Sequence, residues 1–277
     1  MKALTSALTW AAIAVIALTA LPVVAALRLV ERNPARLRTG RAFRIAGSMI
    51  PRINPAWHVR VTGLDPDTLR HPYVVVSNHL SQADIPVVSI LPWEMKWVAK
   101  RELFEVPVLG WMMRMAGDID VDRKDPQSRS SVLARARRRI ERGASVMFFA
   151  EGTRSRDGRL KKFHDGAFRL AVRAGVPVLP LAIDGTGDAL PTSGWKFSEA
   201  DVRLAVLPPV PTDGLTEADV PALRDRVRAM IRAQVADWRG LPEDEVDGLA
   251  ALVEAPSDPG EEPAKSGHGA VPSGRPG

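Results

Sequence analysis

One stretch, residues 74–86, limits most strongly what this chain can fold into. Three consecutive valines, Val74–Val76, favour a buried β-strand, and they lead through Ser-Asn-His to an Asp-Ile-Pro sequence typical of a helix start. Because proline is tolerated in the first turn of a helix, Pro86 places Asp84 close to the helix N-cap. His79 is therefore predicted to lie at the carboxyl end of a buried strand, where open α/β sheets bind their ligands.

The spacing of His79 and Asp84 suggests a catalytic pair. Five residues along a helix correspond to a rotation of about 140°, so the loop has to bring the two side chains together. Asp84 could then accept the Nδ1 proton of His79 and leave Nε2 free as a general base. The alternative is structural: Ser81 and Asp84 form a capping box, and His79 is an ordinary loop residue. Two residue types at one spacing do not decide between these interpretations.

Strand and helix patterns alternate along the rest of the chain. Predicted strands cover residues 57–61, 73–77, 96–99, 117–123, 146–149, 176–183 and 202–206. Predicted helices cover 85–91 and 126–143, a third ends at Gly175, and the last begins at 219. This alternation predicts a layered α/β domain with its chemistry at the strand ends. Two prolines, Pro177 and Pro180, place the 176–183 strand near an edge of the sheet.

Two further strand ends carry candidate ligand-binding groups. The 146–149 strand leads into a loop of Glu151, Gly152, Thr153 and Arg154. Glycine permits close approach of a ligand there, and the guanidinium of Arg154 matches phosphate oxygens bidentately, with a structural salt bridge as its alternative. The 117–123 strand delivers two more groups to the same edge as His79, namely Asp122 and Arg123. A second anion-binding loop makes the His79 loop a candidate active site.

The N-terminus carries a candidate membrane helix. No charged residue occurs from Ala3 to Leu27, and about 25 apolar or small residues are enough to cross a hydrocarbon core of roughly 30 Å. A cleaved signal peptide is the alternative, because Val24-Ala25-Ala26 resembles a cleavage site. Six arginines follow within 17 residues, a bias that would keep the later chain in the cytoplasm. Pro22 permits a re-entrant hairpin, so a monotopic anchor and a full span both remain open.

A second helix over residues 36–50 mixes arginines with apolar residues. This pattern suits either an anionic membrane surface or a solvated helix packed through its apolar stripe.

From about Leu241 the chain becomes acidic and then rich in Pro, Gly and Ser, which predicts a disordered tail. That tail holds eight acidic and two basic residues, so the remaining chain carries about +12 against +6 overall. A basic body beside a membrane anchor suggests anionic lipid as a partner, and we expect no nucleic acid.

Composition and missing motifs exclude several classes of function. The chain has no cysteine, so it can form no disulfide, thiolate zinc site or cysteine nucleophile. It has no G-x-S-x-G sequence, no P-loop and no G-x-G-x-x-G after a strand, which counts against a serine hydrolase and against nucleotide binding. Its five histidines are scattered, so we expect neither a metal site nor a resident cofactor around His79.

These motifs resemble the glycerolipid acyltransferases of the lysophosphatidic acid acyltransferase type. Four blocks match in order over roughly residues 73–183: Asn78-His79-x-x-x-x-Asp84; Gly117-x-Ile119-x-Val121-Asp122-Arg123; Phe149-Ala150-Glu151-Gly152-Thr153-Arg154-Ser155; and Val176-Pro177-Val178-Leu179-Pro180. In the third block Ala150 replaces the usual proline, so we expect a looser loop with retained activity. The resemblance implies a central mixed β-sheet flanked by helices, and the sequence divides into an anchor and interfacial helix (1–50), the acyltransferase domain (51–240) and the tail (241–277).

The resemblance also implies transfer of a fatty acyl group from acyl-CoA or acyl carrier protein to the free hydroxyl of a lysophospholipid, with 1-acyl-glycerol-3-phosphate as the favoured acceptor. It makes His79 the general base and Asp84 the residue that orients it. It assigns acceptor binding, with Arg154 on the phosphate, to these residues: Asn78, Lys100, Asp122, Arg123, Glu151, Gly152, Thr153 and Arg154.

The same motifs serve acylation of glycerol-3-phosphate or lyso-ornithine lipid, and transacylation. From a different class, a non-catalytic basic module that binds the membrane surface stays an alternative. We expect the catalytic domain on the cytoplasmic face of the cell membrane.

Overall fold

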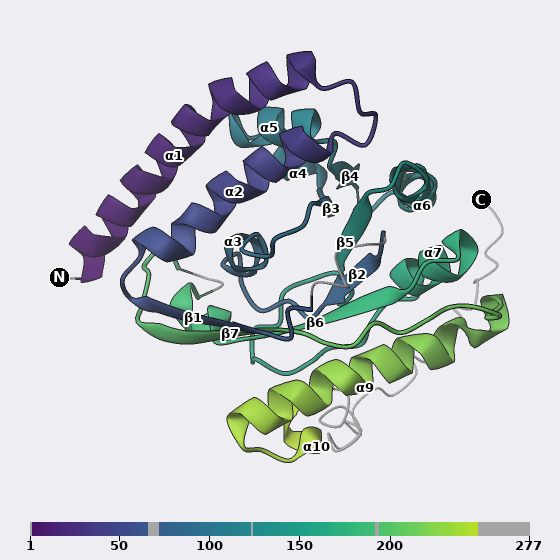
Figure 1. Ribbon diagram of the computed structural model, residues 1–277. Coiled ribbons are helices and arrows are strands. Elements are labelled where there is room, and N and C mark those ends of the chain that lie inside the picture. The colour runs from purple at the N-terminus through teal and green to yellow at the C-terminus, as the bar shows by residue number, and fades with distance from the viewer. Residues whose placement is uncertain (1, 66–71, 123, 192–193, 249–277) are drawn as a thin grey trace, which may run out of the picture.

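A seven-stranded sheet forms the centre of the part of the chain that the computed structural model describes, residues 2–65, 72–122, 124–191 and 194–248 (Figure 1). The strands are β1 (Trp57–Thr62), β2 (Val74–Ser77), β3 (Met95–Lys100), β4 (Ile119–Val121), β5 (Ser145–Phe149), β6 (Val178–Asp184) and β7 (Ala200–Val206). Their order across the sheet is β1-β7-β6-β2-β5-β3-β4. The five strands from β6 to β4 in this order are parallel, β7 is antiparallel to β6, and β1 is parallel to β7. The predicted α/β fold with a mixed sheet is confirmed, and the carboxyl ends of five neighbouring strands meet at one edge.

Helices cover both faces of this sheet (Figure 1). One face carries α6 (Pro126–Glu141), α7 (Gly166–Ala174), the one-turn η2 (Glu217–Asp219), α9 (Val220–Arg239) and α10 (Glu243–Val246). The other side carries α1 (Lys2–Val30), α2 (Leu37–Ile53), α3 (Asp84–Val88), α4 (Arg101–Glu105), α5 (Leu109–Ala116) and α8 (Thr186–Ala189). The helix starts follow local signals: the carboxylate of Asp125 accepts a 2.8 Å bond from Gln127 N and caps α6 as predicted.

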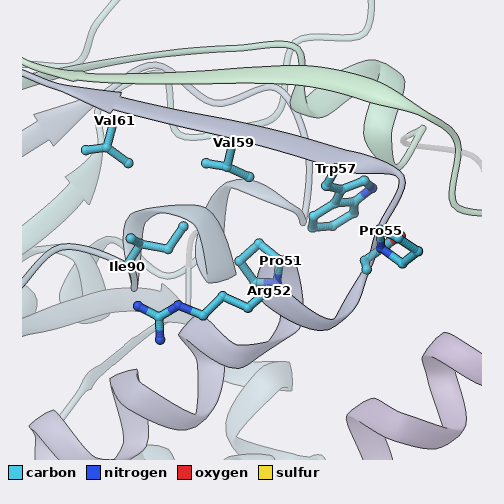
Figure 2. Close-up of a pocket in the computed structure, with 8 residues that line it drawn as sticks. Pro51, Arg52, Pro55, Trp57, Val59, Val61 and Ile90 are labelled. Carbon is cyan, nitrogen blue, oxygen red and sulfur yellow. The ribbon is translucent and has the colours of Figure 1, made fainter.

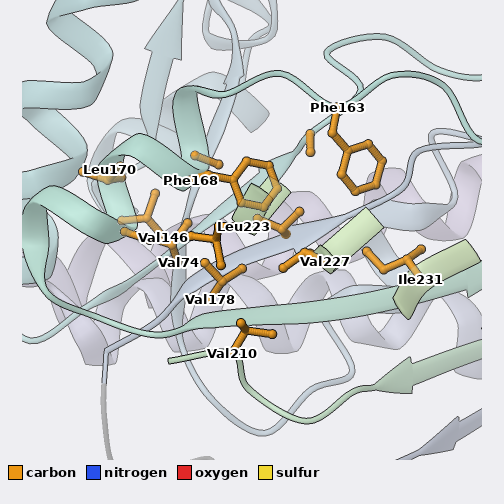
Figure 3. Close-up of a cluster of buried hydrophobic side chains, with 14 of the residues drawn as sticks. Val74, Val146, Phe163, Phe168, Leu170, Val178, Val210, Leu223, Val227 and Ile231 are labelled. Carbon is orange, nitrogen blue, oxygen red and sulfur yellow. The ribbon is translucent and has the colours of Figure 1, made fainter. Parts of the chain in front are cut away.

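Both faces of the central strands are buried in apolar cores. Side chains alternate along β2, so Val74 and Val76 pack into the core beneath α7 and α9, while Val75 packs into the core beneath α2 and α3. Figure 3 shows Val74 and its neighbours pointing toward Phe168 and Val227 in the first core. Burial on both faces is the reason that the strand is a continuous apolar run.

The prediction that the 176–183 strand lies near an edge of the sheet is wrong. β6 is an interior strand, paired with β2 on one side and β7 on the other. Pro180 is accommodated because the regular ladder to β7 begins only at Leu181, while Val178 pairs separately with Val210. The proline therefore stands at an interruption of that ladder, where no strand hydrogen bond is lost.

A buried charge cluster, made of Arg44, Glu94, Lys96 and Asp118, joins α2 to the sheet. The Lys96 side chain is fully buried, and its ammonium donates to Glu94 Oε1 and to the carbonyl of Arg36, both at 2.9 Å. The Arg44 guanidinium pairs with the Asp118 carboxylate, which also accepts a 3.0 Å bond from Trp97 N. Since breaking a buried pair leaves an uncompensated charge, α2 is an integral part of the folded body.

α1 lies along this body (Figure 1). It is the one helix in the described part of the chain that is long and apolar enough to cross a membrane, and its 29 residues extend over about 43 Å. Near its start, Trp10 Nε1 donates to the carbonyl of Trp195 at 2.8 Å, and Ser6 Oγ accepts from Phe197 N at 3.0 Å. Farther along, it contacts α2 and α5. The predicted apolar helix is thus present and attached to the domain.

The folded body continues past Gly240, where the sequence predicts the tail. Val246 is fully buried, and the carboxylate of Asp247 accepts two bonds from the Arg228 guanidinium, one of them at 2.8 Å. Leu160 N donates to the carbonyl of Val246 at 2.9 Å. Residues 241–248 are therefore packed against α9, and the rest of the predicted tail, residues 249–277, lies outside the described residues.

Candidate active site

The loop after β2 is anchored by Asn78. Its side-chain amide pairs with the backbone of Ile183 on β6 in both directions, donating at 2.8 Å and accepting at 3.0 Å. The residue is fully buried. Asn78, a predicted substrate-binding residue, therefore fixes the base of the His79 loop in this structure and presents no free amide to a ligand.

His79 and Asp84 are in direct contact. His79 Nδ1 lies 2.6 Å from Asp84 Oδ2, with Asp84 fully buried and 13% of the His79 side chain exposed. No described residue bonds to His79 Nε2. With the Nδ1 proton directed at the carboxylate, Nε2 carries the free lone pair and is available as a base toward solvent.

The Asp84 carboxylate satisfies both interpretations of the motif at once. Its Oδ2 atom also accepts from Leu80 N at 2.8 Å and from Ser81 N at 3.1 Å, so it closes the loop as half of a capping box. Its Oδ1 atom accepts from the hydroxyl of Thr186, which is fully buried at the start of α8. Four donors thus hold the carboxylate in the one orientation that faces His79.

The loop after β5 packs directly against His79. The Phe149 ring stacks on the imidazole with ring centres 3.9 Å apart and planes inclined by 13°. Glu151 Oε1 accepts from His79 N at 3.1 Å, and Ser155 N donates to the His79 carbonyl at 2.7 Å. Gly152 has a φ of 69°, and a Cβ there would lie 3.1 Å from the His164 ring, so this tight loop favours glycine. The first and third motif blocks therefore form one unit.

Glu151 is a buried acid whose second oxygen, Oε2, has no partner among the described residues. Burial raises its pKa to about 8, and the nearby charge of Asp84 acts in the same direction, against the lowering effect of the His79 and Lys161 N–H groups. The side chain is therefore mainly protonated at neutral pH. Its place is behind His79, where it fixes the main chain of that residue.

Arg154 offers an unpaired cation beside this unit. The side chain is half-buried, and its guanidinium makes no hydrogen bond or ion pair with any described residue, so the structure does not contain the alternative salt bridge. Lys161 Nζ donates to the Arg154 carbonyl at 2.9 Å and lies 3.3 Å from the Thr153 hydroxyl, which ties the loop in place. Two cations thus converge on one loop, a composition suited to an anionic group.

Lys100 and Asp122 reach the same edge but not the His79 loop itself. Lys100 ends β3 and is exposed, and Asp122 follows β4, with its carboxylate 3.6 Å from Arg101. Since adjacent strands are spaced by about 4.8 Å, these strands lie about 10 Å and 14 Å from β2. Only a ligand that extends across the sheet edge could touch both ends. Arg123 lies outside the described residues.

Sequence patterns did not reveal Thr186, Phe149 or Ser155 as partners of the pair. Thr186 follows the carboxyl end of β6 by two residues, so the strand-end rule that singled out His79 would also have selected it. The stacking of Phe149 and the hydrogen bond from Ser155 depend on the register of β2 against β5, in which Ser77 lies opposite Phe149. The residues of neither strand alone predict that register.

One cavity among the described residues lies away from this site. It has a volume of about 410 Å³ at the β1 edge of the sheet, and Figure 2 shows Arg52, Trp57 and Ile90 among its lining. None of its lining residues belongs to the His79 or Glu151 loop. Within the described chain, no three His, Asp or Glu side chains gather where they could hold a metal ion.

Known proteins are similar to this chain in sequence and in fold. The acyltransferase family model matches residues 58–184. The chain is 44% identical over 140 residues to the chloroplastic 1-acyl-sn-glycerol-3-phosphate acyltransferase of Brassica napus, covering 50% of this chain and 41% of that protein. It is 40% identical over 175 residues to the human alpha enzyme of the same name, covering 61% and 62%. The chain thus spans about four to six tenths of the length of these two relatives.

Two further comparisons cover more of each chain. The 1-acyl-sn-glycerophosphate acyltransferase of Thermotoga maritima has the same fold, with a TM-score of 0.70 over 86% of this chain and 98% of that one at 24% identity. The human 1-acyl-sn-glycerol-3-phosphate acyltransferase beta is 33% identical over 199 residues, which are 70% of this chain and 72% of that protein. The chain therefore belongs to the acyltransferase family that includes the 1-acyl-sn-glycerol-3-phosphate acyltransferases.

Proposed function

We propose that this protein transfers a fatty acyl group from acyl-CoA or acyl carrier protein to the sn-2 hydroxyl of 1-acyl-glycerol-3-phosphate, which yields phosphatidic acid for phospholipid synthesis. The observation that carries the proposal is the 2.6 Å contact between His79 Nδ1 and the buried Asp84 carboxylate, with Nε2 left free at the carboxyl edge of the sheet. The family membership and the names of the relatives point to the same reaction.

The proposed chemistry needs only a base. His79 Nε2 removes the proton from the acceptor hydroxyl as the oxygen attacks the thioester carbon. The carbon–sulfur bond then breaks, and the imidazolium returns its proton to the departing thiolate. Because a thioester is already activated, no covalent acyl-enzyme and no cofactor are required. Asp84 holds the ring in the tautomer that leaves Nε2 unprotonated.

Acceptor choice follows from the unpaired cation. The Arg154 guanidinium has no carboxylate partner in the described part of the chain, and Lys161 adds a second positive charge to the loop. A phosphate monoester carries more charge near neutral pH than a zwitterionic head group does. We therefore place the phosphate of the acceptor on Arg154.

The test uses purified full-length protein, labelled oleoyl-CoA and a panel of lysolipid acceptors. His79→Ala should lower kcat by about 10²-fold or more, the usual scale for a lost general base, while His58→Ala, an exposed histidine on β1, should not change it. Arg154→Ala should raise KM for lysophosphatidic acid much more than KM for oleoyl-CoA, and Arg154→Lys should recover part of the loss. Normal turnover by His79→Ala would contradict the mechanism, and faster acylation of lyso-ornithine lipid would contradict the acceptor.

The N-terminal helix supports a place at the membrane. α1 exposes many large apolar side chains, and only Ser6 and Val24 of its residues are buried. Arginines follow it closely in sequence, so we propose that the domain lies on the cytoplasmic face of the cell membrane. Anionic lipid is the proposed membrane partner, because the body of the protein is strongly basic.

A further inference from the structure

Five arginines gather where α1 ends and α2 begins, and we call them the arginine cluster: Arg28, Arg36, Arg138, Arg139 and Arg142. Two of them meet at Gly117, where a Cβ would lie 3.3 Å from Arg36 Cδ and 3.5 Å from Arg139 Nη2. Each of these two is held by the end of α5. Arg36 Nη1 donates to the carbonyl of Arg114 at 2.7 Å, and Arg139 Nε donates to the carbonyl of Gly117 at 3.0 Å.

No carboxylate of the described chain forms an ion pair with the arginine cluster. Three neighbouring acids bind other groups: Glu31 accepts from Arg38 N at 2.8 Å and from Thr39 N at 2.9 Å, Asp118 binds Arg44, and Glu141 binds Arg137. Burial, reinforced by repulsion from neighbouring arginines, lowers the pKa of Arg36 and of Arg139. Like charges held together in this way repel one another, and a bound anion would offset that repulsion.

The arginine cluster is separate from the proposed acceptor site. Gly117 precedes β4 and Arg142 precedes β5, so the cluster lies at the amino edge of the parallel strands. His79 follows β2 at the opposite edge. A strand of five residues such as β5 separates these edges by about 16 Å, so one phosphate cannot be bound at both.

Apolar side chains beside the arginine cluster indicate the kind of anion. Leu29 and Val30 at the end of α1 are 88% and 74% exposed, and Trp111 on α5 is 52% exposed. Arginines next to exposed leucine and tryptophan are the composition of a surface at the boundary between head groups and acyl chains. An acidic protein would match the charges but not the exposed apolar residues.

We propose that the arginine cluster binds the phosphate of an anionic phospholipid, with the acyl chains lying against the end of α1 and Trp111. This site would hold the far end of the domain at the membrane surface, independently of acyl transfer. Arg36 and Arg139 are the fixed donors because α5 carbonyls position them. Arg28, Arg138 and Arg142, whose side chains make no hydrogen bond with a described residue, add charge around them.

The test measures lipid binding to the purified full chain in neutral detergent, with fluorescent short-chain phosphatidylglycerol and phosphatidylcholine. Arg28→Gln/Arg142→Gln removes two cations that make no structural bond in the described chain. Its matched control is Arg60→Gln/Arg226→Gln, which removes two exposed cations on β1 and α9. Each arginine near an anionic head group contributes about 1 kcal/mol, so Kd for phosphatidylglycerol should rise about 25-fold in the first variant and less than about twofold in the control.

Phosphatidylcholine should bind weakly to all three proteins, and inorganic phosphate at equal concentration should not displace phosphatidylglycerol. The proposal is overturned if Kd for phosphatidylglycerol is unchanged in Arg28→Gln/Arg142→Gln, if both double variants lose binding equally, or if inorganic phosphate displaces the lipid. It is also overturned if the same variant loses affinity for acyl carrier protein but not for lipid. Arg138→Gln/Arg142→Gln, confined to α6 and the residue that ends it, repeats the test if the first variant does not fold. The lipid-binding assay does not depend on acyl transfer, so its result can be interpreted even if the protein proves inactive as an acyltransferase.

Discussion

Replacement of Asp84 by asparagine separates the charge of the carboxylate from its role in folding. In the structure, Oδ2 accepts from Leu80 N, Ser81 N and His79, while Oδ1 accepts from Thr186. An asparagine can keep its amide oxygen at the first position and donate from its NH₂ group to the threonine oxygen. The reversed amide would bury two backbone N–H groups without acceptors, at a cost of about 1–3 kcal/mol each. The Asp84→Asn variant should therefore keep the loop and the histidine tautomer and lose only the negative charge.

The expected loss follows from the charge that disappears. A hydrogen bond to a charged group contributes roughly 1.5–3 kcal/mol and one between neutral groups roughly 0.5–1.5 kcal/mol, a difference of about 1–1.5 kcal/mol. Since each 1.36 kcal/mol is a factor of ten in rate, kcat should fall by about 5- to 13-fold. Asp84→Ala leaves the same donors unpaired and should in addition lower the free energy of unfolding by several kcal/mol. kcat at saturating substrates and the midpoint of urea unfolding distinguish the two variants.

Two results would refute this reasoning. If Asp84→Asn turns over within about threefold of the wild type, the carboxylate charge does not assist His79. If Asp84→Asn unfolds as readily as Asp84→Ala, the amide does not adopt the single orientation that the four donors require, and the loss of activity has a structural cause.

Three further predictions rest on buried neighbours of the site and of α2. Thr186→Val removes one donor to Asp84 and should lower kcat roughly two- to tenfold, the scale of one hydrogen bond. Thr186→Ser keeps the hydroxyl and should keep wild-type kcat. Equal kcat in the wild type and both variants would contradict a positioning role. The folded-state pKa of Glu151 is about 8 against an ordinary 4.5, so the free energy of unfolding should fall as the pH rises from about 4.5 to 8, by at most about 5 kcal/mol. Glu151→Gln should abolish that fall, as measured by urea unfolding at several pH values. Gly40→Ala places a Cβ against Glu94 and Lys96 and should lower the free energy of unfolding by roughly 1–3 kcal/mol, measured by thermal unfolding. Gly143→Ala is the control, because a Cβ there meets no neighbouring atom and is strained only by the positive φ.

The sequence predicted the strand-end residues well because their signals are local. Val74–Val76 requires a strand buried on both faces, and Pro86 requires a helix start, so the position of His79 between them follows from neighbouring residues alone. The double role of Asp84, as partner of His79 and as helix cap, could not be predicted in this way. The orientation of its carboxylate also depends on Thr186, which lies 102 residues away and completes the set of donors.

The strand patterns could not predict how far Lys100 and Asp122 lie from His79 along the sheet edge. Lys100 and Asp122 end their strands as predicted, but the order β2-β5-β3-β4 places them two and three strands from the histidine. Strand order is set by packing between segments far apart in the sequence, and nothing local to Lys100 records it. The interior position of Pro180 escaped prediction for the same reason, since the interrupted ladder belongs to β7 and Val210.

The pairing of Arg44 with Asp118 has a consequence for the order of events during synthesis. These residues are 74 positions apart, so at about 5–20 residues per second the arginine is synthesised roughly 4–15 s before its partner. During that interval α1 and α2 have no complete sheet to pack on. With the membrane association proposed above, these two helices could reach the lipid before the catalytic loops are made.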